Sequence, residues 1–209
     1  MEKDTIYLID GSKKLNRNVP LGVIGEFNKF RPIEARVIDE PYLNEFARKT
    51  NRGKVNYLSL CDNVINYFVE DAPNIQTKID RLNGGKLIIL DEDIRSDRTN
   101  VSFGGSMSCR YGGLGTSVVS TARLPTVASA KHVIRHELGH MFGAANEGRS
   151  NTKYTMGWHC TNDLCTMQQK ANLEEAINYA HEIKNSKKKP FCPQCEEDIQ
   201  KYTYNKIKN

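Results

Sequence analysis

The sequence predicts an α/β fold of the α+β kind, in which helices pack against a twisted mixed sheet. Short runs rich in β-branched residues, bounded by Gly, Asn, Pro or Asp, alternate with helical stretches along the first half of the chain. The chain has 209 residues, 38% of them hydrophobic and 26% charged, which suits one ordinary folded domain with a real core. No run is long and apolar enough to cross a bilayer, so we expect no membrane partner.

Three runs in the first half have the character of strands: residues 6–9, 35–38 and 86–90. Between the second and the third, apolar residues recur at three- and four-residue steps from 54 to 69, as one buried helix face requires. The positions of that stripe are Val55, Leu58, Cys61, Ile65 and Phe68. The polar turn 71–74 ends the predicted helix.

Two further runs, 100–107 and 117–121, have the pattern of strands near a sheet edge. The loop between them contains Gly112, Gly113 and Gly115. Catalytic clefts often border such an edge, so we expect the first of these runs to lie beside the functional site.

The segment from 126 to 143 predicts an amphipathic helix. Pro125 and Thr126 are start signals, and Gly143 is a left-handed stop. One stripe of this helix is apolar and is expected to pack on the sheet. Its members are Val127, Ala130, Ile134, Leu138 and Met141. We expect His132 to be a solvated or core-edge histidine; the alternative is that it supports His136, which lies one turn later.

His136, Glu137 and His140 form the motif H-E-x-x-H on the other face of the helix. Residues four apart face one another, so two neutral imidazoles can hold one zinc ion while the glutamate takes a proton from water. A bare match also occurs on surface helices. Gly143 extends the motif to H-E-x-x-H-x-x-G, the turn through which metzincin-type chains bring back a third ligand. Gly139 indicates a close backbone approach at mid-helix.

Cysteine spacing points to a second metal. Cys160 and Cys165 form a C-x4-C pair and Cys192 and Cys195 a C-x2-C pair, whereas Cys61 and Cys109 stand alone. Two close pairs match a closed, all-thiolate structural zinc site. The first residues, with acids where a signal peptide is basic and apolar, predict no export, so we expect reduced thiols and a cytoplasmic protein.

The sequence resembles the archaemetzincins, whose pattern continues from H-E-x-x-H-x-x-G-x-x-H-C to C-x4-C-x-M and C-x-x-C. The matching residues are His136, Glu137, His140, Gly143, His159, Cys160, Cys165, Met167, Cys192 and Cys195. The second half of the chain resembles the family well, and the first part only loosely. The resemblance implies a metzincin-like zincin fold with an active-site helix and a small C-terminal subdomain stapled by zinc. It makes Met167 the methionine beneath the catalytic zinc, a packing residue and not a ligand.

The third ligand departs from the family pattern. Asn146 stands where the family places its third histidine, and the His-Cys pair appears only at His159 and Cys160. We expect residues 144–158 to be an inserted loop and His159 to be the ligand, because an amide is a poor zinc ligand and the later motif stays in register with His159. Glu147 remains the alternative, since carboxylates also bind zinc. The loop would narrow or cover the cleft, with Tyr154 and Trp158 in position to line it.

The function predicted is a zinc-dependent peptidase that hydrolyses peptide bonds with zinc-activated water and Glu137 as the general base. Two zinc ions are implied, one catalytic at His136, His140 and His159 and one structural at the four cysteines. We expect an N-terminal subdomain, 1–143, and a C-terminal subdomain, 144–209. The alternative is a non-catalytic, zinc-stabilised module that binds a peptide or protein.

The expected partner is a peptide or protein substrate, and the protein is expected to be a monomer. Lys184, Lys187, Lys188 and Lys189, beside the predicted four-cysteine zinc site, raise a nucleic-acid partner as an alternative. Three acidic residues close in sequence oppose the positive charge of these lysines: Glu196, Glu197 and Asp198. We therefore expect no nucleic-acid partner.

Overall fold

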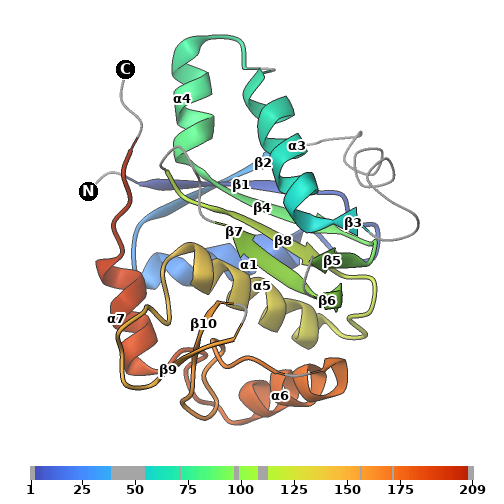
Figure 1. Ribbon diagram of the computed structural model, residues 1–209, viewed down its shortest axis with the longest axis vertical. Helices are drawn as coiled ribbons and strands as arrows, with labels where there is room; N and C mark the ends of the chain where they lie inside the picture. The colour runs from blue at the N-terminus through green and yellow to red at the C-terminus, as the bar shows by residue number, and fades with distance from the viewer. Residues whose placement is uncertain are drawn as a thin grey trace.

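The protein is described from a computed structural model over residues 3–38, 55–70, 72–96, 99–107, 113–155, 157–170 and 172–206. Figure 1 shows a central sheet with helices on both faces and the C-terminal elements beyond one helical layer. The helices are α1 (Asn18–Glu26), the 3₁₀ helix η1 (Phe27–Lys29), α3 (Tyr57–Glu70), α4 (Ile75–Asn83), α5 (Val127–Met141), α6 (Leu173–Asn185) and α7 (Pro193–Lys201). The strands are β1 (Asp4–Asp10), β2 (Ile33–Ile38), β3 (Val55–Asn56), β4 (Gly85–Leu90), β5 (Ile94–Ser96), β6 (Thr99–Ser102), β7 (Gly104–Met107), β8 (Thr116–Ser120), β9 (Thr152–Tyr154) and β10 (Trp158–Cys160).

The main sheet has five strands in the order β2-β1-β4-β8-β7. The first four run parallel to one another, and β7 pairs antiparallel with β8 at the edge. All of β4 is buried, because helices cover both faces of the sheet. The predicted mixed α/β architecture is therefore confirmed.

Side chains alternate across the sheet and fill two cores. On the α3 side, Ile88 and Leu90 pack in one cluster with Leu60 and Cys61. On the opposite side, a larger cluster joins Leu87 and Ile89 to α1, α5 and the C-terminal elements. This larger core seats α5 between the sheet and the C-terminal region (Figure 1).

The limits of α5 follow its sequence signals. Thr126 caps the helix by accepting a hydrogen bond from the Ser129 amide at 3.1 Å. Gly143 follows the helix with φ of +69°, the left-handed conformation that glycine adopts without strain. Both ends agree with the prediction.

Three predicted features are wrong in detail. Val127 does not join the buried stripe of α5, because it occupies the first turn and is 53% exposed. The run 100–107 is not one strand but divides at Phe103 between β6, in a small sheet with β3 and β5, and β7, in the main sheet. Val55 lies in β3 and not in the following helix.

The buried face of α3 also differs from the predicted stripe. Leu60, Cys61 and Val64 are buried, whereas Ile65 is half-buried. The side chains of Leu58 and Phe68 lie outside the described residues, as do Cys109 and Gly112.

The C-terminal tail returns to the first strand. Arg31 and Tyr204 both bond the carboxylate of Asp4, with Tyr204 Oη donating at 2.9 Å. The amide of Gly113 donates to the carbonyl of Asn205 at 2.6 Å. The end of the chain therefore helps to fasten β1 and the loop before β8.

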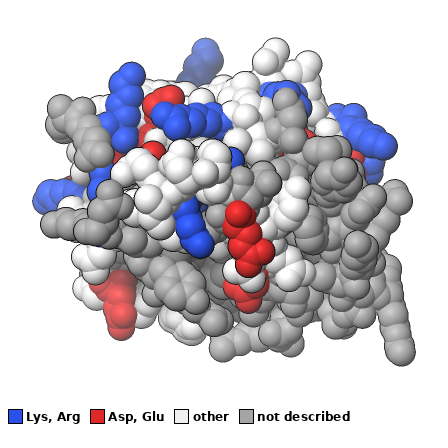
Figure 2. Space-filling view, turned by 90° about the horizontal axis from the view of Figure 1, so that it is seen from above, with Lys and Arg blue, Asp and Glu red and all other residues white. Residues whose placement is uncertain are grey.

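No helix in the described part of the chain combines the length and apolar character needed to span a bilayer. Figure 2 looks at the molecule from above Figure 1, where α3 and α4 lie. Lys and Arg side chains are spread over this face with Asp and Glu side chains between them, so both signs of charge share it.

Candidate metal centres

Three histidines bring their Nε2 atoms together. His136 and His140 project from α5 and His159 from β10. Nε2 of His140 lies 3.1 Å from that of His136 and 3.3 Å from that of His159. Zn–N bonds of about 2.0–2.1 Å place tetrahedral ligand atoms about 3.3–3.4 Å apart, so this spacing fits one zinc ion.

For His136 and His159, the outer ring nitrogens explain why Nε2 carries a lone pair. Nδ1 of His136 donates to the carbonyl of Thr166 at 2.7 Å, and Nδ1 of His159 to the carbonyl of Gly157 at 3.1 Å. A neutral imidazole with its proton on Nδ1 exposes an unprotonated Nε2. Such outer hydrogen bonds are typical of metal-binding histidines.

Burial keeps the three rings neutral. It lowers the pKa of His136 to about 4, and it lowers the pKa of His140 well below the ordinary value. Burial also lowers the pKa of His159, although its bond to Gly157 opposes the shift. Neutral imidazole is the form that binds zinc.

Glu137 lies in a buried niche between α5 and the edge strand β7. Ser106 Oγ donates to Glu137 Oε2 at 2.8 Å, and the backbone of Gly104 approaches so closely that a Cβ there would collide with the carboxylate. Burial raises the pKa of Glu137 to about 7, with the bond from Ser106 opposing the rise. A carboxyl group with such a pKa can both accept and return a proton near neutral pH.

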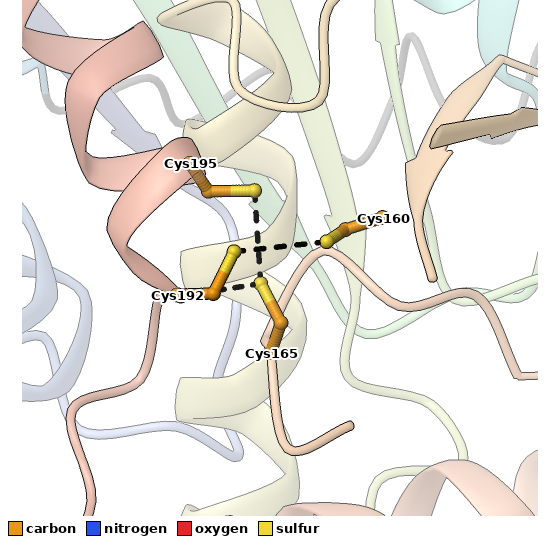
Figure 3. Close-up of side chains that lie close together, drawn as sticks. All are labelled: Cys160, Cys165, Cys192 and Cys195. Atoms are coloured by element: carbon orange, nitrogen blue, oxygen red, sulfur yellow. Dashed lines mark hydrogen bonds between the residues drawn. The ribbon is translucent and has the colours of Figure 1, made fainter. Parts of the chain in front are cut away.

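The four paired cysteines converge at a second point, and Figure 3 shows their sulfurs pointing toward one another. Sγ of Cys160 lies 3.7 Å from that of Cys192, and Sγ of Cys165 lies 3.7 Å from that of Cys195. Tetrahedral zinc with Zn–S bonds of about 2.3 Å separates its sulfurs by about 3.8 Å. The donor set and its spacing therefore fit a closed zinc site.

N–H donors surround these sulfurs, as expected of thiolates. The Asn162 amide donates to Cys160 Sγ at 3.4 Å, and the Cys192 amide to Cys165 Sγ at 3.5 Å. Arg149 Nη2 donates to Cys195 Sγ at 3.4 Å. These contacts place positive charge and hydrogen-bond donors where a zinc-tetrathiolate would carry negative charge.

Met167 packs beneath the histidine helix. It is fully buried, and a Cβ on Gly139 would collide with its sulfur. The close backbone approach predicted at Gly139 is therefore confirmed. The carbonyl of Met167 also accepts the amide hydrogen of Cys160 at 2.9 Å, so the same short segment contacts both metal centres.

The structure brings His159, and not Glu147, to the two helix histidines. Asn146 and Glu147 are exposed, and the Asn146 amide points to Asp198 at 3.4 Å. His132 is buried rather than solvated, with its ring edge-on to Tyr179 at 5.7 Å. Tyr154 is 58% exposed and packs against Trp158.

Sequence reasoning missed two residues of the histidine site. Ser106 touches Glu137, and Thr155 Oγ1 lies 3.1 Å from Nδ1 of His159. Both are ordinary hydroxyl residues in short polar contexts. Only the folded chain shows that they face the site, so no spacing signal could have identified them.

Comparisons with known proteins identify the fold. No family model and no curated protein matches the chain. Among solved structures, archaemetzincin from Methanopyrus kandleri is similar with a TM-score of 0.59 and 20% identity over 95% of this chain and 94% of that one. A zinc-dependent peptidase from Methanocorpusculum labreanum matches with a TM-score of 0.59 and 16% identity, covering 93% of this chain and 99% of the other.

Archaemetzincin from Archaeoglobus fulgidus, solved as a complex with malonate, matches with a TM-score of 0.56 and 18% identity, covering 93% of this chain and 99% of that one. All three likenesses extend over nearly the whole of both chains, so they describe the entire architecture and not one motif. The chain therefore has the archaemetzincin fold.

Proposed function

We propose that this protein is a zinc-dependent peptidase of the archaemetzincin type. The observation that carries the proposal is the convergence of the Nε2 atoms of three histidines, two of which stand on the same helix as the buried carboxyl group of Glu137. The structural neighbour from Methanocorpusculum labreanum, which is named a zinc-dependent peptidase, adds support. A module that only bound peptides would have no need of Glu137.

His136, His140 and His159 would hold the catalytic zinc. When bound, zinc polarises a substrate carbonyl and makes water more acidic. Hydrogen bonds at Nδ1 hold the rings of His136 and His159 in place. Little rearrangement is therefore needed on metal binding.

Glu137 would act as general base and then as general acid. Its carboxylate would take a proton from the attacking water and return that proton to the departing amine. Ser106 holds Oε2 through its donated hydrogen bond and so fixes the orientation of the carboxylate. The buried niche raises the basicity of the group, because a carboxylate is poorly solvated there.

A substrate would lie extended along β7. This strand ends the sheet order and packs against α5 beside Glu137. Main-chain pairing with an edge strand gives affinity without demanding particular side chains. The expected substrates are therefore peptides or proteins in extended conformation.

The four cysteines would hold a structural zinc, which brings the total to two ions. Cys160 follows His159 directly, so the structural site also restrains the third catalytic ligand. We propose that residues 144–209 form a C-terminal subdomain organised by this zinc. The preceding residues, 1–143, supply the sheet and the active-site helix.

Metal analysis combined with cleavage of a peptide library tests the proposal. Glu137→Gln keeps the shape of the side chain but removes the base, so it should retain both zinc ions and lose about 10²–10⁴-fold in turnover. His159→Ala should lose one zinc, whereas Glu147→Ala, which alters an exposed residue, serves as the control and should keep both.

Full turnover by Glu137→Gln would contradict the peptidase mechanism. Wild-type protein that binds two zinc ions, holds peptides and leaves every library member intact would instead favour the non-catalytic binding module. Loss of the catalytic zinc from Glu147→Ala would show that the ligand assignment is wrong.

A further inference from the structure

The segment between Gly143 and His159 is fastened at its first end to the four-cysteine centre. Arg149 Nη1 forms an ion pair with Asp198 at 2.5 Å, while its Nη2 donates to Cys195 Sγ. The same Asp198 carboxylate accepts the amide hydrogen of Ala145 at 3.0 Å. These contacts bind the beginning of the segment to α7.

The second end of the segment is a tight hairpin. Strands β9 and β10 pair so that Lys153 faces His159. The Thr155 amide donates to the carbonyl of Gly157 at 2.8 Å, and Gly157 has φ of +130°, a conformation that favours glycine. The turn therefore places Thr155 and the Gly157 carbonyl beside the ring of His159.

A chain of hydrogen bonds runs from Gln169 through Thr155 to His159. The Thr155 hydroxyl donates to Gln169 Oε1, which leaves its oxygen lone pair facing His159 Nδ1 at 3.1 Å. The Gly157 carbonyl accepts from the same nitrogen. Both acceptors require the proton on Nδ1, so Nε2 of His159 is left bare and aimed at the other histidines.

We propose that Thr155, held by Gln169, is a positioning residue for His159, and that residues 144–158 form a scaffold for the third zinc ligand. The inference rests on the proposed function, because it takes His159 as a ligand. The side chain of Tyr154 is largely exposed to solvent. This exposure is compatible with a scaffold, whereas a hairpin that covered the histidines would bury the side chain against them. The segment thereby orients the third ligand.

The test is zinc affinity of the full-length protein, measured by chelator competition without any peptide. Thr155→Val keeps the side-chain shape and removes the hydroxyl, so zinc at the histidines should bind about 10-fold more weakly while zinc at the cysteines is retained. Thr155→Ser restores the hydroxyl and should bind zinc like the wild type. Thr203→Val is the matched control at an exposed tail position and should leave both affinities unchanged.

A second readout separates positioning from a merely structural role. In the zinc-loaded protein, the Nδ1 proton of His159 should exchange with water faster in Thr155→Val than in Thr155→Ser or the wild type, as followed by nitrogen-15 NMR. If Thr155→Val fails to fold, Gln169→Leu gives the same test, because it frees the Thr155 hydroxyl to turn away.

Wild-type zinc affinity in both Thr155→Val and Gln169→Leu would overturn the inference. A different outcome is that the protein binds zinc at the histidines and shows these affinity changes but cleaves no peptide. That outcome would refute the proposed peptidase activity and leave the positioning role of Thr155 intact. Wild-type protein that binds zinc only at the cysteines would overturn both.

Discussion

On α5, the side chains of His132 and Glu137 are buried and that of His136 is half-buried, and none of the three forms an ion pair within the described residues. His132, His136 and Glu137 are each shifted toward the neutral form, mainly because burial disfavours charge. For His136 the neutral state is the form that binds zinc, and a carboxyl group with the raised pKa of Glu137 can exchange a proton near neutral pH. The ring of His132 lies 6.4 Å from that of His136, and its Nδ1 has no hydrogen-bond partner among the described residues, so its effect should fall on stability.

His132→Phe should make the protein more resistant to acid. Burial lowers the pKa of His132 to about 3, and its Nδ1 finds no hydrogen-bond partner within the described ranges. A buried histidine with a depressed pKa supports folding above its unfolded pKa of about 6.5, and that support is lost as pH falls from there toward 3 at up to about 1.4 kcal/mol per unit. The acid midpoint, followed by circular dichroism, should move to lower pH.

The control for this prediction is His181→Phe on α6, measured at the same zinc concentration. Phenylalanine preserves the edge-on ring contact that His132 makes with Tyr179, so packing loss should not mask the effect. An acid midpoint equal to that of the wild type would show that His132 does not contribute to acid unfolding.

The residue type and spacing of candidate metal ligands can be recognised in a sequence more readily than the residues that form hydrogen bonds to the side chains of the site. Histidine and cysteine have few roles at these spacings, so the sequence could indicate both metal centres. Ser106 and Thr155 belong to residue types that occur throughout loops and strands. Their roles come from long-range folding, which brings Ser106 to α5 and Thr155 to Gln169.

At the scale of elements, α5 packs closely against the segment around Met167 because Gly139 has no side chain. Gly139 occupies the middle of the helix, where glycine destabilises by up to about 1 kcal/mol relative to alanine. The Met167 sulfur fills the space that a Cβ would need. The contact lets the turn lie directly beneath the histidine face.

Gly139→Ala should therefore destabilise the protein by about 1–3 kcal/mol despite its better helix propensity, because the added methyl group displaces Met167. Gly22→Ala is the matched control on α1, where a Cβ meets nothing within 4 Å, and it should stabilise by about 1 kcal/mol. Urea unfolding of the zinc-loaded proteins compares the two. Equal stability gains in both variants would contradict the packing argument.

Elements with a strong local signal were predicted with nearly correct limits. β4 is buried on both faces and its last four residues, 87–90, form an unbroken apolar run, and α5 has a cap at one end and a glycine at the other. The sequence of the run 100–107 does not indicate that it divides at Phe103. The division arises because β6 and β7, on either side of Phe103, pair with different sheets. Tertiary contacts, and not propensity, make that break.

At the scale of the whole molecule, the four-cysteine centre is part of the larger core. Cys160, Cys165 and Cys195 share that cluster with Phe191, whose ring packs edge-on against Phe27 at 5.6 Å. The smaller core on the α3 side includes none of these residues. Loss of metal should therefore weaken the larger core, on the α5 side of the sheet, before the smaller core on the α3 side.

Removing zinc with a chelator should expose the C-terminal elements first. Amides of β10 and α7 should exchange with deuterium early, since their packing depends on the bound metal, while amides of β4 stay protected between the two cores. Hydrogen exchange read by mass spectrometry checks the order, with Cys61→Ser as a control for a cysteine outside the centre. Simultaneous loss of protection throughout the chain would show that the cores do not respond separately.

The overall architecture was predictable from alternating strand and helix signals and from the family resemblance. The return of the tail to β1 was not, because Tyr204 and Asp4 form a single hydrogen bond between the two ends of the chain. A contact between residues so far apart in the sequence produces no periodic pattern from which it could be predicted.

This return has a consequence for synthesis. A nascent chain that has emerged through β8 already contains the four parallel strands, yet Asp4 still lacks Tyr204 and Gly113 still lacks Asn205. Both partners are translated well after the residues that they contact. The sheet can therefore assemble during translation, whereas these fastening contacts form only after residues 204 and 205 have emerged.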